Sequence, residues 1–376
     1  MAGNQRQRRR ISTFHMDDSW RGRLQPYMGT LKLVSAVAGL MLAGVGGFYA
    51  VLSRQLDRKW PPPPEVTRAE TRRLLRGAAL REHIAPDPRV AYMFLLRALE
   101  QIHGDGVLDE DAPAVQEIVV RMANAAAQVG EKEPAVRMLE GAWHRVVDAD
   151  GHIAPDDSGW TRLQVCRIAD VLGPLQLKTN HSEAIRTYGT ALRAAKHVLD
   201  SDSSGDAGDV REEMLLRHAN YLTSLGEAFA LVGDLDSSQA LLSGVLKELR
   251  DRQPAGDEPG AKKADRWTCL DAIVMLDLAQ VARKRGGLDE ARAWASAGVA
   301  VTEKWPGTHA CEMCHGHLLA QLAAIAEIQG DKQACRNLHS AALKHARSTG
   351  KGAAEKAEED IRRIDAELSP SPDKTE

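Results

Sequence analysis

The sequence predicts an all-α protein in which an amino-terminal transmembrane helix is followed by an α-solenoid of tetratricopeptide-like helical hairpins. Apolar and small residues recur at three- and four-residue spacing along most of the chain. Hydrophobic residues make up 43% of the 376 residues but aromatic residues only 4%, which is typical of helices that pack through Ala and Leu. Turns and small residues also recur in phase from one hairpin to the next, as in repeat proteins.

Residues 1–32 form a basic amino-terminal segment that we expect to stay outside the fold. Residues 1–16 contain four arginines and no acidic residue, which is typical of mitochondrial targeting segments. A basic tail beside a membrane helix is the alternative. More Lys and Arg residues precede the next apolar run than follow it, so the amino terminus is expected on the matrix side of the mitochondrial inner membrane.

Residues 33–53 are expected to cross the bilayer once, because roughly twenty uncharged residues in a helix span a hydrocarbon core of about 30 Å. Every fourth residue on one side of this helix is small, which would let another membrane helix approach closely, although Gly and Ala are common in membrane spans. These packing candidates are Ser35, Gly39, Ala43 and Gly47. Residues 54–65 contain the run Pro61–Pro64 and are expected to form a stiff linker.

Residues 66–347 are expected to form the repeat array, residues 348–368 a capping helix, and residues 369–376 a disordered tail. The tetratricopeptide pattern places small residues at positions eight, twenty and twenty-seven of each copy, with a turn near position fifteen. Copies begin at Arg72, Gln116, Val165, Ala219, Ala272 and Gly316. Their residues at the three small positions are Ala79, Ala91 and Ala98; Ala123, Ala135 and Ala142; Leu172, Ala184 and Ala191; Gly226, Ser238 and Val245; Ala279, Ala291 and Gly298; and Ala323, Cys335 and Ala342.

The segment Cys311-Glu-Met-Cys314-His315 matches the short C-x-x-C-H pattern of haem attachment. No second axial ligand can be assigned, and a covalent haem there would obstruct the stacking of the last hairpin. A disulfide or labile thiol pair in this segment, and two ordinary cysteines, are the alternatives. Asp148-x-Asp150-Gly151 lacks the full spacing of a calcium loop and is interpreted as an acidic turn. We therefore expect no cofactor and no metal.

No catalytic motif is found in the chain. It contains neither G-x-x-x-x-G-K-[ST], G-x-S-x-G, H-E-x-x-H nor G-x-G-x-x-G. A net charge of -3 does not favour a general nucleic-acid binder. We predict a protein that is not an enzyme, with no small-molecule substrate and no nucleic-acid partner.

The function is then expected to lie on the surface of the repeats. In tetratricopeptide arrays the first helix of each hairpin lines a groove, and its positions two, five, nine and twelve meet a bound peptide. The candidate residues are Val120, Asn124, Ala169, Asn220, Thr223, Glu227, Ile273, Leu276, Gln280, Arg283, His317, Ala320 and Glu327. They do not include the cluster of Lys, Arg and Asn that would bind a terminal carboxylate.

The segment Asp87-Pro-Arg-Val-Ala-Tyr-Met-Phe-Leu-Leu-Arg-Ala-Leu-Glu100 resembles the D-P-x-x-A-x-x-Y-x-x-A-L segment of fungal adaptor subunits of the mitochondrial inner-membrane i-AAA protease. The last repeat, with Cys311 and Cys314 ahead of Ile325-Ala-Glu-Ile-Gln-Gly-Asp331, is also similar to that family's last repeat. This chain also has the same order of parts as that family: a basic start, a single membrane span, a proline-bearing linker and then the repeats.

This resemblance implies a non-enzymatic, single-pass adaptor with its repeats in the intermembrane space. Such a subunit recruits unfolded or membrane protein substrates to the AAA protease. The alternative is a scaffold or assembly factor for a membrane complex, either of the respiratory chain or, in a bacterium, a periplasm-facing chaperone-like protein.

Overall fold

The computed structural model of the protein describes residues 47, 51–106, 108–154, 160–201, 208–252, 269–305, 308–349 and 351–368. The chain divides into two compact units, residues 1–87 and residues 88–376. The described parts of both units are helical, and the one β-bridge among the described residues joins Val147 and Ile153. The predicted all-α class is confirmed.

The described part of the first unit contains a helix over residues 51–59 and helix α3 (Ala69–His83). The Arg76 guanidinium donates to both carboxylate oxygens of Asp57, at 2.7 and 2.8 Å. The Trp60 ring stacks on the His83 ring with 4.3 Å between centroids. Leu56 is buried, as are two of the prolines that follow.

The stiff linker predicted over residues 54–65 is wrong for residues 54–59, whereas Pro61–Pro63 lie outside any helix or strand. Residues 54–59 are helical, because Leu56, Asp57 and Trp60 give this stretch its own inward-facing contacts. No helix within the described ranges is long and apolar enough to cross a bilayer. Most of the predicted span 33–53 lies outside these ranges, as do Ser35, Gly39 and Ala43, whereas Gly47 is described as exposed.

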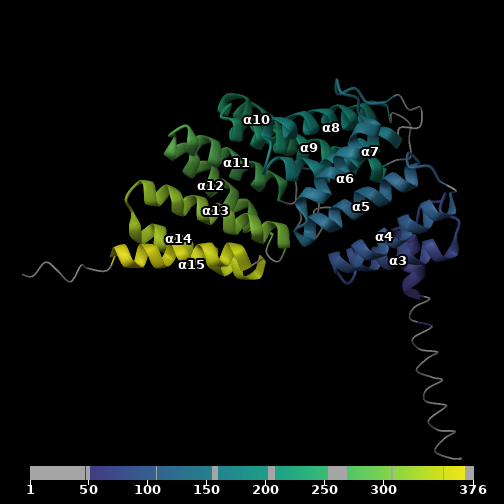
Figure 1. Cartoon of the computed structure of the whole chain (residues 1–376). Helices are drawn as coiled ribbons and strands as arrows, with labels where there is room; N and C mark the ends of the chain where they lie inside the picture. The colour runs from purple at the N-terminus through teal and green to yellow at the C-terminus, as the bar shows by residue number, and fades with distance from the viewer. Residues whose placement is uncertain are drawn as a thin grey trace, which may run out of the picture. The chain divides into compact units, whose positions relative to one another are not determined.

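The second unit is a series of helices in which each contacts the next along the chain (Figure 1). First helices of neighbouring hairpins also touch, since α5 contacts α7, α9 contacts α11 and α11 contacts α13. This is a solenoid-like helical repeat fold. The helices are α4 (Pro88–Asp105), α5 (Pro113–Val129), α6 (Lys132–Val146), α7 (Trp160–Gln176), α8 (His181–Ser201), α9 (Gly208–Val232), α10 (Leu235–Arg252), α11 (Leu270–Lys284), α12 (Leu288–Thr302), α13 (His309–Ile328), α14 (Lys332–Thr349) and α15 (Lys351–Leu368).

The small residues predicted at positions eight, twenty and twenty-seven are buried in all six copies. In the copy from Ala219, the Ser238 hydroxyl donates to the carbonyl oxygen of Gly226 at 2.6 Å, which shows how closely α9 and α10 approach. The turn positions of four copies hold glycines with positive φ, which favours Gly over residues with a Cβ. They are Gly130, Gly233, Gly286 and Gly330.

The copy predicted from Arg72 is not a single hairpin within one unit. Its first helix α3 belongs to the first unit and its second helix α4 to the other, because the unit boundary falls between Asp87 and Pro88. Instead of the short Gly turn, residues 84–87 connect the two helices, and Pro88 starts a new one. The sequence pattern thus detected small residues at the right positions without detecting this boundary.

Helix α9 takes part in two hydrophobic clusters. Tyr221 and Leu225 belong to a cluster that also includes residues of α5 to α8. Ala219 belongs to another, formed with residues of α10 and α11. A single helix therefore connects the core of the earlier hairpins to that of the later ones.

Helix α15 (Lys351–Leu368) packs on the last hairpin, whereas residues 348 and 349 of the predicted capping segment belong to α14. Ile364 is buried against Ala323, Ala326 and Cys335. Salt bridges surround this contact and join α15 to both helices of the hairpin. The pairs are Arg363 with Glu327 at 2.6 Å, Lys332 with Glu367 at 3.0 Å, and Arg336 with Asp365.

Candidate functional site

A pocket of 640 Å³ lies where α7, α8 and α9 meet. Most of its residues come from α9, which begins at Gly208, well before the repeat start predicted at Ala219. This extension carries three of the lining residues. The pocket is lined by Asp170, Pro174, Tyr188, Glu213, Leu216, Arg217, Asn220, Tyr221 and Ser224.

Asp170 on α7 is the centre of a polar network in this pocket. The Tyr221 hydroxyl donates to its Oδ1 at 2.6 Å and also lies 2.9 Å from the carbonyl oxygen of Cys166. Arg217 lies 3.3 Å from Asp170 Oδ2 and pairs with Glu213 at 2.9 Å. Burial raises the pKa of the Asp170 carboxyl, while Arg217 and the Tyr221 hydrogen bond lower it in part. The network therefore joins α7 to α9 through charge and hydrogen bonds.

Two tyrosines form an aromatic wall of the pocket. The Tyr188 and Tyr221 rings are 6.2 Å apart and inclined by 37°. A Cβ at Gly173 would lie 2.5 Å from the Tyr188 ring, so glycine is needed for this ring to approach α7. Burial raises the pKa of Tyr188 to about 12 and that of Tyr221 further, so both phenols are protonated near neutral pH.

Tyr221→Phe is expected to lower the free energy of unfolding by about 1.5–3 kcal/mol, because it removes a hydrogen bond to a carboxylate. It should also raise the pKa of Asp170, because that hydrogen bond favours the ionised carboxyl. Urea unfolding and a carboxyl NMR titration measure the two effects. Tyr188→Phe is the matched control, since its hydroxyl bonds the neutral Ser224 and its loss should cost only about 0.5–1.5 kcal/mol. Equal effects of both variants would contradict this description of the network.

Asn220 is the predicted groove residue that lines this pocket. Val120, Ala169 and Thr223 are buried, so the expectation that they are exposed to a peptide is wrong. All three occupy position five of their copies. Val120 and Ala169 share one hydrophobic cluster, and the Thr223 hydroxyl donates to the carbonyl oxygen of Ala219 within its own helix.

The other predicted groove residues remain accessible to different degrees. Exposed ones are Asn124, Glu227, His317 and Glu327, and half-buried ones are Ile273, Leu276, Gln280, Arg283 and Ala320. Glu327 is already paired with Arg363 of the capping helix. The accessible residues include Asn124 and Glu227 at position nine, His317 at position two and Glu327 at position twelve.

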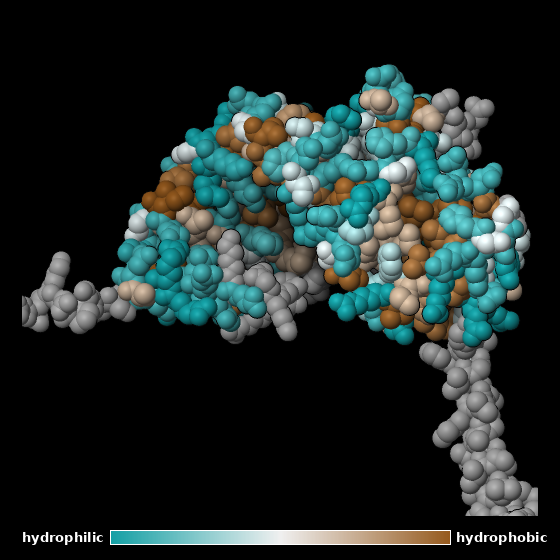
Figure 2. Space-filling view, in the orientation of Figure 1, coloured by the Kyte–Doolittle hydropathy of each residue, from teal (hydrophilic) through white to brown (hydrophobic). Residues whose placement is uncertain are grey.

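Hydrophilic residues dominate the face of the described residues seen in Figure 2, with apolar residues scattered among them. The repeat unit exposes a few large apolar side chains, among them two consecutive residues at the end of α9 and the last residue of α13. These are Leu231, Val232 and Ile328. They do not line the pocket.

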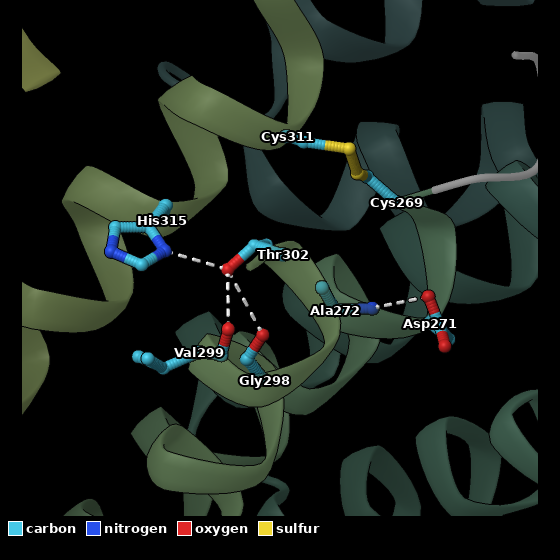
Figure 3. The surroundings of a disulfide bond; sticks show 8 residues. All are labelled: Cys269, Asp271, Ala272, Gly298, Val299, Thr302, Cys311 and His315. Carbon is cyan, nitrogen blue, oxygen red and sulfur yellow. Dashed lines mark hydrogen bonds between the residues drawn. A yellow bond between two sulfur atoms is a disulfide. The ribbon is translucent and has the colours of Figure 1, made fainter. Parts of the chain in front are cut away.

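The cysteine motif is part of a structural bond. Cys311, in the first turn of α13, forms a disulfide with Cys269, which directly precedes α11 (Figure 3). Neither a Cys311–Cys314 disulfide nor a haem held by both cysteines is compatible with this bond. Cys314 is a buried thiol whose pKa burial raises to about 12. Cys335, at position twenty of the last copy, is also buried.

His315 takes part in the same local structure. Its Nδ1 lies 2.8 Å from the Thr302 hydroxyl, which also bonds the carbonyl oxygen of Val299 (Figure 3). Its ring is 4.5 Å from that of His345. Burial and the neighbouring His345 lower the pKa of His315. These contacts join α12, α13 and α14.

The acidic turn at Asp148 is closed by its own side chain. Asp148 Oδ1 accepts hydrogen bonds from the backbone N–H groups of Asp150 at 3.0 Å and His152 at 2.7 Å. Gly151 takes a positive φ, and the turn ends at the bridge between Val147 and Ile153. The geometry agrees with an Asx-type turn.

No protein-family model matches the chain, and no curated protein matches its sequence. Seventy-two chains of solved structures are similar to it. BtubC (BKLC) from P. vanneervenii shares 14% identity over 77% of this chain and 96% of its own, with a TM-score of 0.43. The apo form of RapI shares 9% identity over 79% and 97%, with a TM-score of 0.49.

A circular tandem repeat protein with novel repeat topology shares 13% identity over 92% of this chain and 94% of its own, with a TM-score of 0.30. Such low identities and TM-scores carry no conclusion about the function of this chain.

Proposed function

We propose that the chain is a non-enzymatic adaptor that binds polypeptides through the first helices of tetratricopeptide-type hairpins. The observation that carries the proposal is the pocket between α7, α8 and α9, where two tyrosines, a charged network and Asn220 face one space. Aromatic rings beside hydrogen-bonding groups suit the mixed side chains and backbone of an unfolded client.

The arrangement of the first helices supports the same proposal. Positions two and nine carry exposed or half-buried side chains on α5, α9, α11 and α13, so a client held at the pocket has further contacts along the unit. These residues have mixed chemistry, which suits binding of many sequences better than recognition of one. The charge network is internally paired, so a client need not supply a particular ion.

More specifically, we propose that the clients are unfolded or membrane proteins destined for the AAA protease of the mitochondrial inner membrane. Residues 33–53 would anchor the chain, with the repeats in the intermembrane space. The resemblance of residues 87–100 and of the last repeat to the protease's adaptor subunits supports this proposal. The Cys269–Cys311 disulfide is in keeping with a compartment that is not strongly reducing.

A photoreactive amino acid at Asn220, in the full chain expressed in its own cells, tests the proposal. Asn220 lines the pocket, whereas Lys247 is exposed on α10 and does not line it, so Lys247 is the matched control position. We expect Asn220 to crosslink to many proteins whose degradation slows when the chain is deleted. Lys247 should crosslink to few of them.

Two outcomes would contradict the proposal in different ways. The same crosslinking pattern from Asn220 and Lys247 would exclude the pocket as the client site. Crosslinks from Asn220 only to subunits of one stable membrane complex, with unchanged protein degradation after deletion, would instead favour a scaffold or assembly factor.

A further inference from the structure

The last hairpin brings together a carboxylate, a thiol and an imidazole. Glu327 is near the end of α13, and Cys335 and His339 are on α14. One ligand atom from each of the three lies within 4.8 Å of those from the other two. Cys335 and His339 are four residues apart, so they lie on the same face of α14. Cys335 is 0% and His339 7% exposed, while Glu327 is open to solvent.

The other hairpins show that the fold does not need these residue types. Glu327, Cys335 and His339 occupy positions twelve, twenty and twenty-four of their copy. The equivalent residues are Ala127, Ala135 and Leu139; Gln176, Ala184 and Tyr188; Ala230, Ser238 and Leu242; and Arg283, Ala291 and Ala295. None of these sets combines a thiol with an imidazole or a carboxylate. Among these hairpins, the last one alone therefore combines a carboxylate, a thiol and an imidazole at these three positions.

We propose that Glu327, Cys335 and His339 bind a zinc ion, in a site with three protein ligands and a fourth position open to solvent. Thiolate, imidazole and carboxylate are the ligands that zinc takes in proteins. Tetrahedral zinc holds its ligand atoms roughly 3.3–3.6 Å apart, so each side chain needs to move by only about 1 Å. The exposed Glu327 lies on the solvent side of the proposed site.

Zinc binding would change the state of both Cys335 and Glu327. Zinc replaces the thiol proton of Cys335, which passes to solvent. Burial raises the pKa of this thiol, and the nearby Arg363 opposes that shift. Glu327 must also turn from Arg363, 2.6 Å away, towards the ion. Asp360 and Glu367 of α15 lie near Cys335 and add negative charge around the site.

The test uses the purified full chain, titrated with zinc by calorimetry and with cobalt by absorption spectroscopy. We expect one tightly bound zinc per chain and a cobalt spectrum with a thiolate-to-metal band. Cys335→Ala and His339→Leu should each weaken zinc binding at least tenfold. Both variants introduce residues already present at the equivalent positions, Ala135 and Leu139, so the helices should remain folded, which circular dichroism checks.

His152→Gln is the matched control, because Asp148, Asp150 and His152 form an exposed cluster that also brings ligand atoms within 4.8 Å of one another. This variant should leave the tight zinc site unchanged. The proposal is overturned if the wild-type chain binds no stoichiometric zinc, or if His152→Gln removes the binding. It is also overturned if the thiolate band persists in Cys335→Ala, since another cysteine would then be the ligand.

Discussion

Replacing both Cys269 and Cys311 with Ser is expected to lower the free energy of unfolding by about 4 kcal/mol. The disulfide closes a loop with a sequence separation of 42 residues, and opening it restores the conformational freedom of that loop in the unfolded chain. In the folded protein it holds the start of α11 beside the start of α13. Urea unfolding of the wild type and the double variant measures the loss.

Reductant provides the control for this experiment. It should shift the wild-type unfolding curve towards that of the double variant and leave the variant's own curve unchanged. The denatured, oxidised wild type should expose three reactive thiols, those of Cys166, Cys314 and Cys335, out of five cysteines. Five reactive thiols before reduction, with no effect of reductant on stability, would show that this bond does not form in solution.

The contact between Gly298 of α12 and Leu318 of α13 is expected to show strong coupling. Leu318 is fully buried, so Leu318→Ala should lower the free energy of unfolding by about 2–5 kcal/mol. A Cβ at position 298 would lie 2.8 Å from Leu318 Cδ2. Gly298→Ala should therefore cost about 1–3 kcal/mol through overpacking, partly offset by the better helix propensity of Ala, worth about 1 kcal/mol.

The double variant distinguishes this description from two independent defects. With Leu318 shortened, the methyl group that Gly298→Ala introduces occupies space that the leucine has left. The loss in the double variant should be smaller than the sum of the two single losses by about 1 kcal/mol or more. Additive losses, measured by urea unfolding of all four proteins, would mean that α12 and α13 do not meet at this point.

Much of the repeat fold was predictable because it depends on local patterns. Small residues such as Ala123 and Ala342 must lie between close helices, and glycines such as Gly130 and Gly330 allow the tight turns. The contact of α15 with the last hairpin follows equally from the apolar side of this charged helix. The boundary at Asp87 and Pro88 has no such signal, because it depends on long-range contacts rather than on periodicity.

The candidate site was less predictable. Asp170, Arg217 and Tyr221 lie outside positions two, five, nine and twelve, and Arg217 joins them because α9 begins well before Ala219. A charged residue in an amphipathic helix is predicted to be exposed to solvent. Its ion-pair partner on another helix therefore cannot be predicted from the sequence. The Cys269–Cys311 disulfide is hard to predict for a related reason, since Cys269 lies 42 residues before Cys311 in the sequence.

Helix α9, which belongs to two hydrophobic clusters, has a consequence for cooperativity. In repeat proteins stability passes between nearest neighbours, so a helix that two clusters share transmits a local opening in both directions. Hydrogen exchange of α9 should therefore track the opening of the whole repeat unit, whereas α15 should exchange with the last hairpin alone. Because α9 also lines the proposed client pocket, binding of a client there should slow hydrogen exchange in helices on both sides of α9, including helices that do not contact the client.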